Sequence, residues 1–546
     1  MELKMQNESN ILHGPPLSAL LQIDKGSLGE LLIHKIAEHK TKVAQINAHT
    51  NEERTFKQIY DDTRKLAIFL KKDGVKMDDR LAICSENNLN FCIPVCATFY
   101  LGCAICPLNP LYTERELEHS LCISKPKYIF ISPMASQVVQ KVANKLSWSP
   151  KLVLLYDNPT VNLPTMKNLI SNISKDEMNE FKITKIMDIK SHVAAILCSS
   201  GTTGLPKGVM LTDKNYFTIF QHLMQPELPF ARSDRNALGL LPFFHTYAFT
   251  VMIVLLLNGA TNVILSRFEE KLFLETIQNY KIQNLTLVPP LMTFLAKHPL
   301  VDQYDLSSVQ NIWCGAAPLS EALQRAVVNR LNITEIRQAY GLTESSLAVT
   351  SSPPGKFKYG SVGVLVSGIS GKVVPIDKPN CSTPLGPYRQ GELCFKGDLI
   401  MKGYCNNKNA TDATIDKDGW LHTGDIGYYD EDGFFFIVDR IKELIKYKGF
   451  QVPPAELEAV LLTCLGIKDA AVIGVPNEEV GELPMAFVVK DNTCNITANE
   501  IHKYLAERVS SHKRLRGGIK FVDNIPKTAS GKILRRDLRN MVKSNL

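Results

Sequence analysis

Long uninterrupted apolar runs are missing from this sequence of 546 residues. Its two most apolar stretches, residues 91–108 and 247–265, are each broken by Gly, Asn or Tyr. A helix needs about 20 consecutive apolar residues to cross a bilayer. The two stretches therefore predict buried elements of a core, and the sequence as a whole predicts a soluble protein.

An excess of one charge is also missing. The chain has 62 Lys and Arg residues and 55 Asp and Glu residues, which gives a net charge of only +7. A nucleic-acid-binding surface usually shows as a concentrated basic stripe, and none is present. Anionic small molecules need only a few local cations, so they stay possible ligands. The length predicts roughly three to four domain-sized units.

The cysteines argue against a disulfide-bonded protein and against a zinc site. The chain has 13 cysteines but begins with the polar run MELKMQNESN, so we expect free thiols in a reducing compartment and no disulfide framework. The tightest pair, Cys103 and Cys106, has no second Cys/His pair at zinc spacing. Buried packing is the interpretation that we adopt for both thiols.

The order of patterns predicts how the chain is organised, and there are no internal repeats or low-complexity segments. Helical and extended patterns alternate through the first two thirds, for example residues 56–74 followed by 80–86, which predicts helices covering parallel sheets. From about 355 to 440 short β-rich runs are separated by Gly, Pro and Asp turns. After Arg440, the run QVPPAELEAVLL predicts a helix start and a separate α/β module.

A run of small donors with one cation, SSGTTGLPKG, occupies residues 199–208, directly after an expected strand. Glycines there let the backbone turn and expose successive N–H groups, which can cradle phosphate. Lys207 adds a point charge suited to a β- or γ-phosphate. The G-K-[ST] ending of a Walker A loop is absent, and an ordinary Gly/Thr surface turn is the alternative interpretation.

Four further motifs make the pattern specific. They are AYGLTES (339–345), GELCFKG (391–397), GWLHTGDIGYYDEDGFFFIVDRIKELIKYKGFQV (419–452) and PKTASGKILRR (526–536). In this order the motifs resemble those of the adenylate-forming superfamily, which includes acyl-CoA synthetases, 4-coumarate:CoA ligases and beetle luciferases. The resemblance covers nearly the whole chain.

The resemblance implies an α/β fold with a large and a small domain. Residues 1–440 would form an N-terminal domain of two α/β sheet subdomains and a small β-barrel subdomain, at about 355–440. Residues 441–546 would form a mobile α/β C-terminal domain. The implied reaction has two steps: a carboxylate attacks the α-phosphate of Mg-ATP to give acyl-adenylate and pyrophosphate, and the thiol of CoA then displaces AMP.

Residue types in these motifs suit that chemistry, because both steps concentrate negative charge. The resemblance implies that Asp425 binds the ribose hydroxyls, with Arg440 as its cationic partner, although a turn carboxylate is the alternative. Glu344 would hold Mg²⁺, a hard cation that prefers oxygen ligands, or would simply be solvated. The further residues implied for ATP and AMP are Ser199, Ser200, Gly201, Thr202, Thr203, Gly204, Lys207, Gly315, Ala316, Ala317, Gln338, Ala339, Tyr340, Gly341 and Thr343, with core packing as the alternative for the alanines.

Two lysines receive separate roles from the resemblance. Lys532 would bridge the reacting carboxylate and the α-phosphate during adenylation, and Lys446 would enter the site for thioester formation. Two lysines on opposite faces of one small domain cannot easily serve one site together, so the domain is expected to rotate between the steps. Lys442, which the resemblance also places among the residues for ATP and AMP, lies at the expected hinge, a short segment that absorbs large φ/ψ changes.

The acyl and CoA sites are less sharply defined. His245 resembles a gate over the acyl carboxylate, although a lone His among aromatic residues is often a core residue. Tyr247, Phe249 and Leu347 are expected to line the acyl pocket. The residues expected on the CoA side are Arg267, Lys448, Gly449 and Gln451.

Departures from the luciferase pattern favour a medium- or long-chain fatty acid as the carboxylate. Luciferases carry Arg, His and Ser where this chain has Thr218, Phe244 and Leu347. A hydroxycinnamate ligase and a luciferase-type monooxygenase stay open as alternatives. A catalytically inactive binding protein is disfavoured, because the cationic and acidic motif residues are present. An adenylation domain that loads a carrier protein is disfavoured, because no carrier module follows.

The last three residues, Ser544, Asn545 and Leu546, resemble the peroxisomal S-K-L address with Asn in place of the cation. We expect a peroxisomal import receptor as a partner and the peroxisome as the location. An arbitrary chain end, with a cytoplasmic protein, is the alternative.

Overall fold

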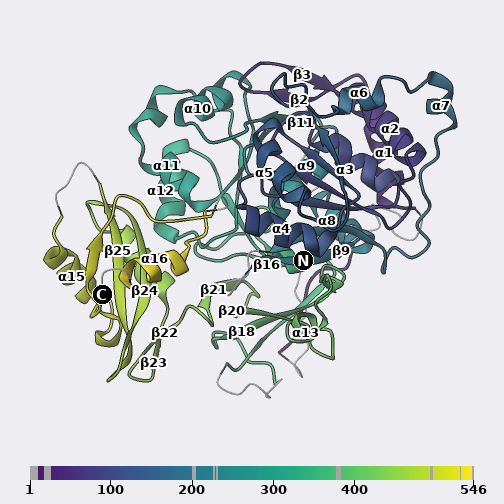
Figure 1. Cartoon of the computed structure of the whole chain (residues 1–546). Coiled ribbons are helices and arrows are strands. Elements are labelled where there is room, and N and C mark those ends of the chain that lie inside the picture. Colours follow the sequence, from purple (N-terminus) through teal and green to yellow (C-terminus); the bar gives the residue numbers. More distant parts are fainter. Residues whose placement is uncertain are drawn as a thin grey trace.

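The fold is described by a computed structural model of the chain (Figure 1). The structure describes residues 10–17, 26–199, 205–225, 228, 232–376, 383–491, 496–528 and 531–543. A large domain carries two mostly parallel sheets and one antiparallel sheet, and a small α/β domain follows residue 440. The expected α/β fold with a large first and a small second domain is confirmed.

The first of the two large sheets has nine strands. Its central strands pair in parallel, and its ends carry antiparallel strands. In spatial order the strands are β16 (Val364–Leu365), β15 (Thr350–Ser351), β14 (Ile336–Tyr340), β13 (Asn311–Cys314), β12 (Asn284–Leu287), β10 (Asn236–Gly239), β11 (Thr261–Ile264), β2 (Val43–Asn47) and β3 (Glu53–Thr55).

The second large sheet has seven strands. Five of them are parallel, and β9 and β19 continue the sheet in antiparallel pairing. The order is β19 (Gly403–Tyr404), β9 (Lys207–Thr212), β8 (Val193–Ser199), β5 (Ala104–Leu108), β4 (Arg80–Cys84), β6 (Tyr128–Ile131) and β7 (Lys151–Leu154).

Helices cover these sheets in layers, as the alternating sequence pattern predicts. Strand β4 shows the division: Leu81 and Ile83 face the central core, whereas Ala82 and Cys84 face an outer core with helices α4 and α5. The helices of the large domain are α1 (Leu28–Glu38), α2 (Phe56–Lys72), α3 (Cys92–Tyr100), α4 (Glu114–Ser124), α5 (Pro133–Ala143), α6 (Met166–Ile170), α7 (Lys175–Glu180), α8 (Asp213–Leu223), α9 (Thr246–Asn258), α10 (Glu270–Asn279), α11 (Pro289–Lys297), α12 (Glu321–Leu331) and α13 (Lys408–Asp412).

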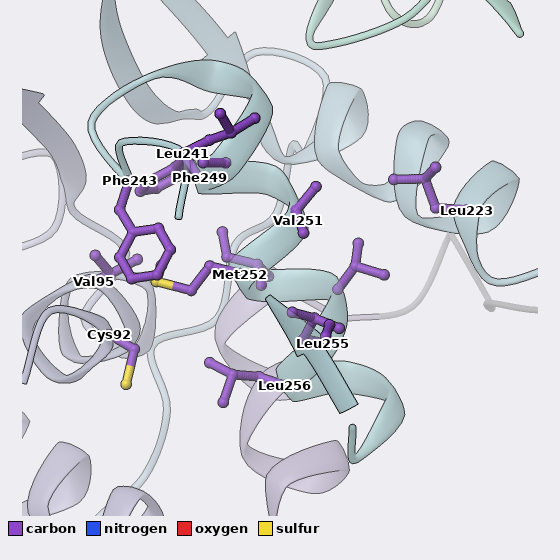
Figure 2. Close-up of a cluster of buried hydrophobic side chains, with 14 of the residues drawn as sticks. Cys92, Val95, Leu223, Leu241, Phe243, Phe249, Val251, Met252, Leu255 and Leu256 are labelled. Carbon is purple, nitrogen blue, oxygen red and sulfur yellow. The ribbon is translucent and has the colours of Figure 1, made fainter. Parts of the chain in front are cut away.

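The two most apolar sequence stretches form buried elements, as expected. All nine residues of α3 are buried, and α9 is apolar around nearly its whole circumference. Figure 2 shows Phe249 and Met252 of α9 packed toward Phe243 and Val95. Among the described residues, no helix combines the length and the apolar character that crossing a bilayer requires.

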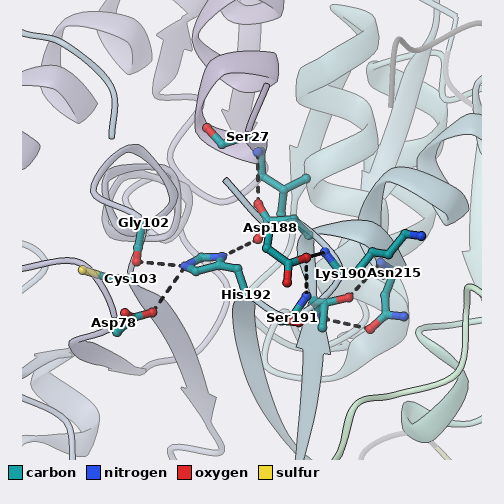
Figure 3. Close-up of polar contacts among 12 residues, drawn as sticks. Ser27, Asp78, Gly102, Cys103, Asp188, Lys190, Ser191, His192 and Asn215 are labelled. Carbon is teal, nitrogen blue, oxygen red and sulfur yellow. Dashed lines mark hydrogen bonds and ion pairs between the residues drawn. The ribbon is translucent and has the colours of Figure 1, made fainter. Parts of the chain in front are cut away.

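A buried polar network fixes the start of α8 against neighbouring elements (Figure 3). His192 contacts the carboxylate of Asp213 through Nδ1 and the carbonyl of Gly102 through Nε2, at 3.0 Å for the second contact. The other oxygen of Asp213 accepts from the backbone N–H of Leu28 at 3.2 Å. Burial lowers the pKa of His192, but Asp213, the carbonyl of Gly102 and Asp78 together raise it more, so that the pKa lies above its ordinary value.

The antiparallel sheet of the large domain has five strands. They are β1 (Leu12–His13), β17 (Ile369–Val374), β18 (Gly391–Gly397), β20 (Leu421–Tyr429) and β21 (Phe435–Arg440), in that order. The sequence resemblance implies a barrel here. Among the described strands, β1 and β21 are edges that do not pair with each other, so the observed arrangement is an open sheet.

The small domain packs helices on both faces of one sheet. Strands β23 (Phe450–Val452), β22 (Ile445–Tyr447), β25 (Gly481–Lys490) and β24 (Ile467–Asn477) follow in order, and β26 (Ile519–Phe521) pairs with β25. Val472 faces a core with α14 (Pro454–Leu462) and α15 (Ala498–Ala506), whereas Ile473 faces a core with α16 (Arg535–Lys543).

Buried charges connect the small domain to the segment that joins the domains. Arg535 lies 2.7 Å from Glu458 and 3.4 Å from Glu443, and Glu458 also accepts from the backbone N–H of Val472 at 2.8 Å. Burial raises the pKa of Glu458, and Arg535 opposes that rise. Asp439 of β21 accepts from the N–H of Ala455 at the start of α14, at 2.9 Å.

The first prediction concerns this buried ion pair. Arg535→Ala leaves the Glu458 carboxylate buried without its cation, which we expect to cost about 3–5 kcal/mol of the stability of the small domain. Hydrogen exchange should report the loss as a fall of about a hundredfold or more in the protection of the Val472 amide. Arg536→Ala, at the exposed neighbouring position, is the matched control. Equal protection in the two variants would contradict the assignment.

Candidate functional site

The carboxylate of Asp425 lies at the centre of the site. It is 4% exposed, accepts from the hydroxyl of Tyr340 at 2.7 Å and lies 3.0 Å from Nε of Arg440. Asp425 and Arg440 are directly opposite in the β20–β21 pair, and Tyr340 ends β14 of the nine-stranded sheet. Burial and the nearby carboxylate hold the pKa of Tyr340 well above its ordinary value. The side chains of Tyr340 and Arg440 therefore both contact the carboxylate of Asp425.

The backbone around Asp425 is held by short-range hydrogen bonds. Thr423 donates through Oγ1 to the carbonyl of Leu393 on β18 at 2.8 Å. The N–H of Asp425 donates to that same Oγ1 at 3.0 Å. Thr423, in the sequence Thr423–Gly424–Asp425, therefore fixes the backbone position of Asp425 relative to β18.

The phosphate-loop cation and the expected magnesium ligand meet at a third side chain. Strands β8 and β9 pair so that Ser199 lies opposite Lys207. The ammonium group of Lys207 lies 4.6 Å from the ring centroid of Tyr404, and the Tyr404 hydroxyl donates to Oε1 of Glu344 at 2.8 Å. Sequence reasoning missed Tyr404. The run Lys402–Gly403–Tyr404, a few residues past the GELCFKG motif, is the signal that could have identified it.

Some predicted residues cannot be placed. Ser200, Gly201, Thr202, Thr203 and Gly204 lie outside the described residues, as do Ser544, Asn545 and Leu546. Their roles stay predictions.

The residues expected around the adenine line the ends of β13 and β14. Ala316 is exposed and has a left-handed backbone with φ of 70°, which is strained for a residue with a Cβ. Gly315 is buried before it, and Ala317 is half-buried after it. Gln338 points its amide at the side chain of Gln324 at 3.1 Å, inside the core. Ala339 follows Gln338 on β14, at a half-buried position.

Gly341 shows why the GLTE motif begins with glycine. A Cβ there would lie 1.9 Å from the carbonyl oxygen of Leu347, so only glycine fits. Thr343 and Glu344 follow in the short 3₁₀ helix η3 (Thr343–Ser345). The close approach at Gly341 therefore folds the chain back beside the segment that carries Leu347.

Lys532 reaches this site from the small domain. A Cβ on Gly531 would lie 2.8 Å from the ring of Pro290, so the turn that precedes Lys532 packs against the start of α11. In Figure 1 the C-terminal segment before α16 reaches toward the large domain. Burial lowers the pKa of Lys532 to about 8, and the charge of Arg440 acts in the same direction, whereas Asp425, Glu443 and Glu344 oppose it. The structure therefore brings Lys532 together with the predicted nucleotide residues.

Lys446 lies elsewhere on the small domain. It is exposed on β22, opposite Gln451 on β23, and Figure 1 shows this hairpin at the end of the small domain away from α11. Lys448 and Gly449 form the hairpin turn, with φ of 48° and 81°, the left-handed pair of a two-residue turn. Gln451 lines a cavity of about 680 Å³ between the small domain and the antiparallel sheet.

Lys442 is exposed in the turn that connects the two domains. Its neighbours on both sides are anchored: the N–H of Ile441 donates to the carbonyl of Gly424 at 2.9 Å, and Glu443 contacts Arg535. Between these two anchors, Lys442 is placed as a hinge residue would be.

The predicted acyl-pocket residues divide into two groups. His245 caps α9 and packs its ring 4.5 Å from that of Phe244, and burial lowers its pKa to about 4. Tyr247 approaches Gly315 and donates to the carbonyl of Trp313 at 3.2 Å. Phe249, in contrast, is wholly buried against Tyr216 in the core. Leu347 is half-buried beside Gly341.

Arg267, which was predicted to contact CoA, lies on the surface of the large domain. It pairs with Glu269 at 2.7 Å, and its side chain is 77% exposed. Exposed pairs of this kind contribute little stability, so Arg267 can be drawn to another anion at small cost.

Two family models match the chain. The model described as "AMP-binding enzyme" matches residues 32–405, and the one described as "AMP-binding enzyme C-terminal domain" matches residues 456–532. Together they cover parts of both domains and the motifs at 339–345 and 391–397, and the second model ends within the motif at 526–536.

Curated relatives fall into two groups. A luciferin 4-monooxygenase of Luciola mingrelica is 41% identical over 99% of this chain and 99% of its own. The 4-coumarate–CoA ligase 2 of Nicotiana tabacum is 38% identical over 94% and 93% of the two chains. Both groups are similar to this chain along nearly its full length.

Solved structures add information on domain arrangement. ATP-bound MatB from Rhodopseudomonas palustris matches with a TM-score of 0.84 at 25% identity, covering 94% of this chain and 99% of that one. Apo MatB from the same source, with 94% and 98% covered, matches with a TM-score of only 0.74. Because the identity is the same, the difference comes from conformation. By this measure the chain is more similar in structure to the ATP-bound form than to the apo form.

The second prediction tests the electrostatic environment of Lys532. Its charged form is disfavoured by Arg440 and favoured by Asp425. Arg440→Gln should therefore raise the pKa of Lys532 from about 8, and Asp425→Asn should lower it. The pKa can be read from the pH titration of ¹³C-methylated lysines by NMR, with Lys532→Arg used to assign the resonance. A pKa that both substitutions leave unchanged would show that Lys532 is not in this site.

Proposed function

The chain belongs to the AMP-binding family of adenylate-forming enzymes, and from this premise we propose that it is an acyl-CoA ligase. It activates a carboxylate as acyl-AMP and then transfers the acyl group to CoA. The observation that carries the proposal is the position of Lys532, a half-buried cation in a turn that packs against Pro290, within electrostatic reach of Asp425, Arg440 and Glu344. A second lysine, Lys446, lies exposed on the other side of the same small domain.

In the first step a carboxylate oxygen bonds to the α-phosphorus of ATP, and the bond to the bridging oxygen breaks, so pyrophosphate leaves. The reacting groups are both anions, and Lys532 offsets their repulsion. Asp425 binds the ribose hydroxyls when ATP displaces its contact with Tyr340, and Lys207 faces the β- and γ-phosphates.

His245 acts as a neutral group at physiological pH, because burial lowers its pKa to about 4. A neutral imidazole neither attracts nor repels the substrate carboxylate by charge. It can still donate or accept one hydrogen bond while packing against the aromatic ring of Phe244. We therefore assign it to positioning the carboxylate next to Lys532.

Glu344 fits the role of a magnesium ligand. Its carboxylate is half-buried, and it lies next to the cation–aromatic pair of Lys207 and Tyr404. Mg²⁺ typically uses one or two protein carboxylates together with substrate phosphates. The bound ion would neutralise phosphate charge.

In the second step the sulfur of CoA bonds to the acyl carbon, and AMP leaves. We propose that the small domain rotates about Lys442, so that Lys532 leaves the site and the hairpin of Lys446, Lys448 and Gly449 enters it. The contact between Asp439 and the N–H of Ala455 joins the two domains, and it must break in that rotation.

We propose a medium- or long-chain fatty acid as the substrate. Thr218 on α8 is wholly buried, and its hydroxyl donates to the backbone carbonyl of Lys214 at 2.8 Å, so it offers no charge to a polar ligand. Leu347 and Phe244 add apolar surface beside Gly341 and His245. These side chains favour an alkyl chain over a polar heterocycle.

A luciferase-type monooxygenase is the second candidate. It is favoured by one observation, the 41% identity to a luciferin 4-monooxygenase against 38% to a 4-coumarate–CoA ligase. The two values are close, and the side chains at 218, 244 and 347 argue against it.

The third prediction tests the substrate class. With Mg-ATP, CoA and a pooled panel of fatty acids, hydroxycinnamates and luciferin, mass spectrometry should detect fatty acyl-CoA as the main product. Cinnamoyl-CoA alone would move the chain to the aromatic ligases. Light from luciferin and oxygen, without any thioester, would replace the proposal with the monooxygenase.

The fourth prediction tests the division between the two lysines. Lys532→Ala should slow acyl-AMP formation by about 10²–10³-fold, because one transition-state cation is lost, yet should still transfer supplied acyl-AMP to CoA. Lys446→Ala should show the reverse pattern. Each half-reaction can be followed separately by quenched-flow mass spectrometry. Lys448→Ala, on the same hairpin as Lys446, is the matched control for acyl-AMP formation. Equal loss of both half-reactions in either variant would exclude separate roles.

A further inference from the structure

Three potential metal ligands converge on the antiparallel sheet, away from the predicted magnesium ligand. Nδ1 of His422 lies 2.8 Å from Oε2 of Glu392 and 3.5 Å from Sγ of Cys394. The ligand atoms of all three side chains lie within 4.8 Å of one another. Cys394 is buried, and Glu392 and His422 are half-buried.

Strand register explains why these side chains meet. Cys394 of β18 is directly opposite His422 of β20, so both side chains lie on one face of the sheet. Glu392 precedes Cys394 by two residues and shares that face. An irregularity in the pairing lies between Glu392 and Cys394, where β20 accommodates extra residues, among them Thr423 and Gly424. The cluster therefore sits directly behind the bulge that carries Asp425.

The two separations from Nδ1 of His422 lie near those of a tetrahedral ion. With bonds of ordinary length to zinc, a tetrahedral site places N and O about 3.3 Å apart and N and S about 3.6 Å apart. The observed N–S separation is 3.5 Å, and the N–O separation of 2.8 Å needs to lengthen by about half an ångström. Small side-chain rotations on a fixed backbone can supply that change.

A fourth residue supports the ligand geometry. Nε2 of His422 lies 3.5 Å from Oδ2 of Asp416, on the ring edge opposite the cluster. Metal-bound histidines usually make such a contact through their other nitrogen, because it fixes the orientation and tautomer of the ring. The His422 side chain is 34% exposed, which leaves a route for an ion and room for water as a fourth ligand.

The local charge balance permits a divalent cation. A metal-bound thiolate, Glu392 and Asp416 together supply three negative charges. Lys372, opposite Cys394 on β17, supplies one positive charge, and its ammonium group lies 4.4 Å from the ring centroid of Trp420.

We propose that Glu392, Cys394 and His422 form a binding site for a borderline-soft divalent cation such as Zn²⁺, with Asp416 orienting His422. A thiolate ligand and an imidazole select this class of ion over Mg²⁺. The site is independent of the carboxylate that holds the nucleotide's magnesium.

The ion would stiffen the nucleotide site. Oε1 of Glu392 accepts from the N–H of Gly424 at 3.0 Å, and Gly424 precedes Asp425. An ion on Oε2 leaves Oε1 free to keep that hydrogen bond. Occupancy therefore fixes the loop that holds the ribose carboxylate, without any contact between the ion and the reacting atoms.

The fifth prediction tests this site with Co²⁺ as a spectroscopic probe of the full chain. Titration should produce thiolate-to-cobalt charge-transfer absorption and the intense visible bands of a tetrahedral ion. Zn²⁺ should abolish both, and Mg²⁺ should not. Asp416→Asn should weaken Co²⁺ binding by about 10- to 100-fold.

Two variants and one control make the test decisive. Cys394→Ala should remove the charge-transfer absorption, and Cys122→Ser, at an exposed free cysteine, should keep it. If Cys394→Ala does not fold, His422→Gln serves instead, because that side chain is partly exposed, and it should weaken binding. The site would be refuted if the unmodified chain gave no cobalt spectrum. It would also be refuted if Cys394→Ala and His422→Gln both gave the same spectrum as the unmodified chain. His422 and Glu392 would then form a simple ion pair.

Discussion

The buried carboxylate of Asp425 is the group on which the rest of the site depends. It is 4% exposed, so its charge must be compensated locally, and the compensation comes from Tyr340 of β14 and Arg440 of β21. These residues belong to the nine-stranded sheet and to the last strand before the hinge. One buried charge therefore links the end of β14, the antiparallel sheet and the domain junction.

Lys532 extends this network across the domains. Its burial lowers its pKa, whereas three carboxylates from Asp425, Glu443 and Glu344 favour its charge. Rotation of the small domain would separate Lys532 from Asp425 and Glu344 and expose it to water. The preferred domain orientation must therefore depend on how much negative charge the site holds, which changes when pyrophosphate leaves.

Several residues that the motifs predicted for one site lie together in the structure, because residues within one motif are constrained locally in type and spacing. Asp425 and Arg440 were expected to lie together and do so, and Tyr340, expected at the adenine, also contacts Asp425. Tyr404 was missed, since its importance comes from pairing of β19 with β9, which places it between Lys207 and Glu344. Phe249 was expected in the acyl pocket, yet α9 turns it into the core against Tyr216.

The sequence by itself determined the α/β class, the order of large and small domains, the buried nature of its apolar stretches and the family to which its motifs belong. These properties follow from local periodicity and from short spacings along the chain. The tertiary structure decided that Lys532 and not Lys446 faces Asp425, and that Glu392, Cys394 and His422 share one face of a sheet. Strand register and domain orientation set such contacts, and both depend on packing between residues far apart in sequence.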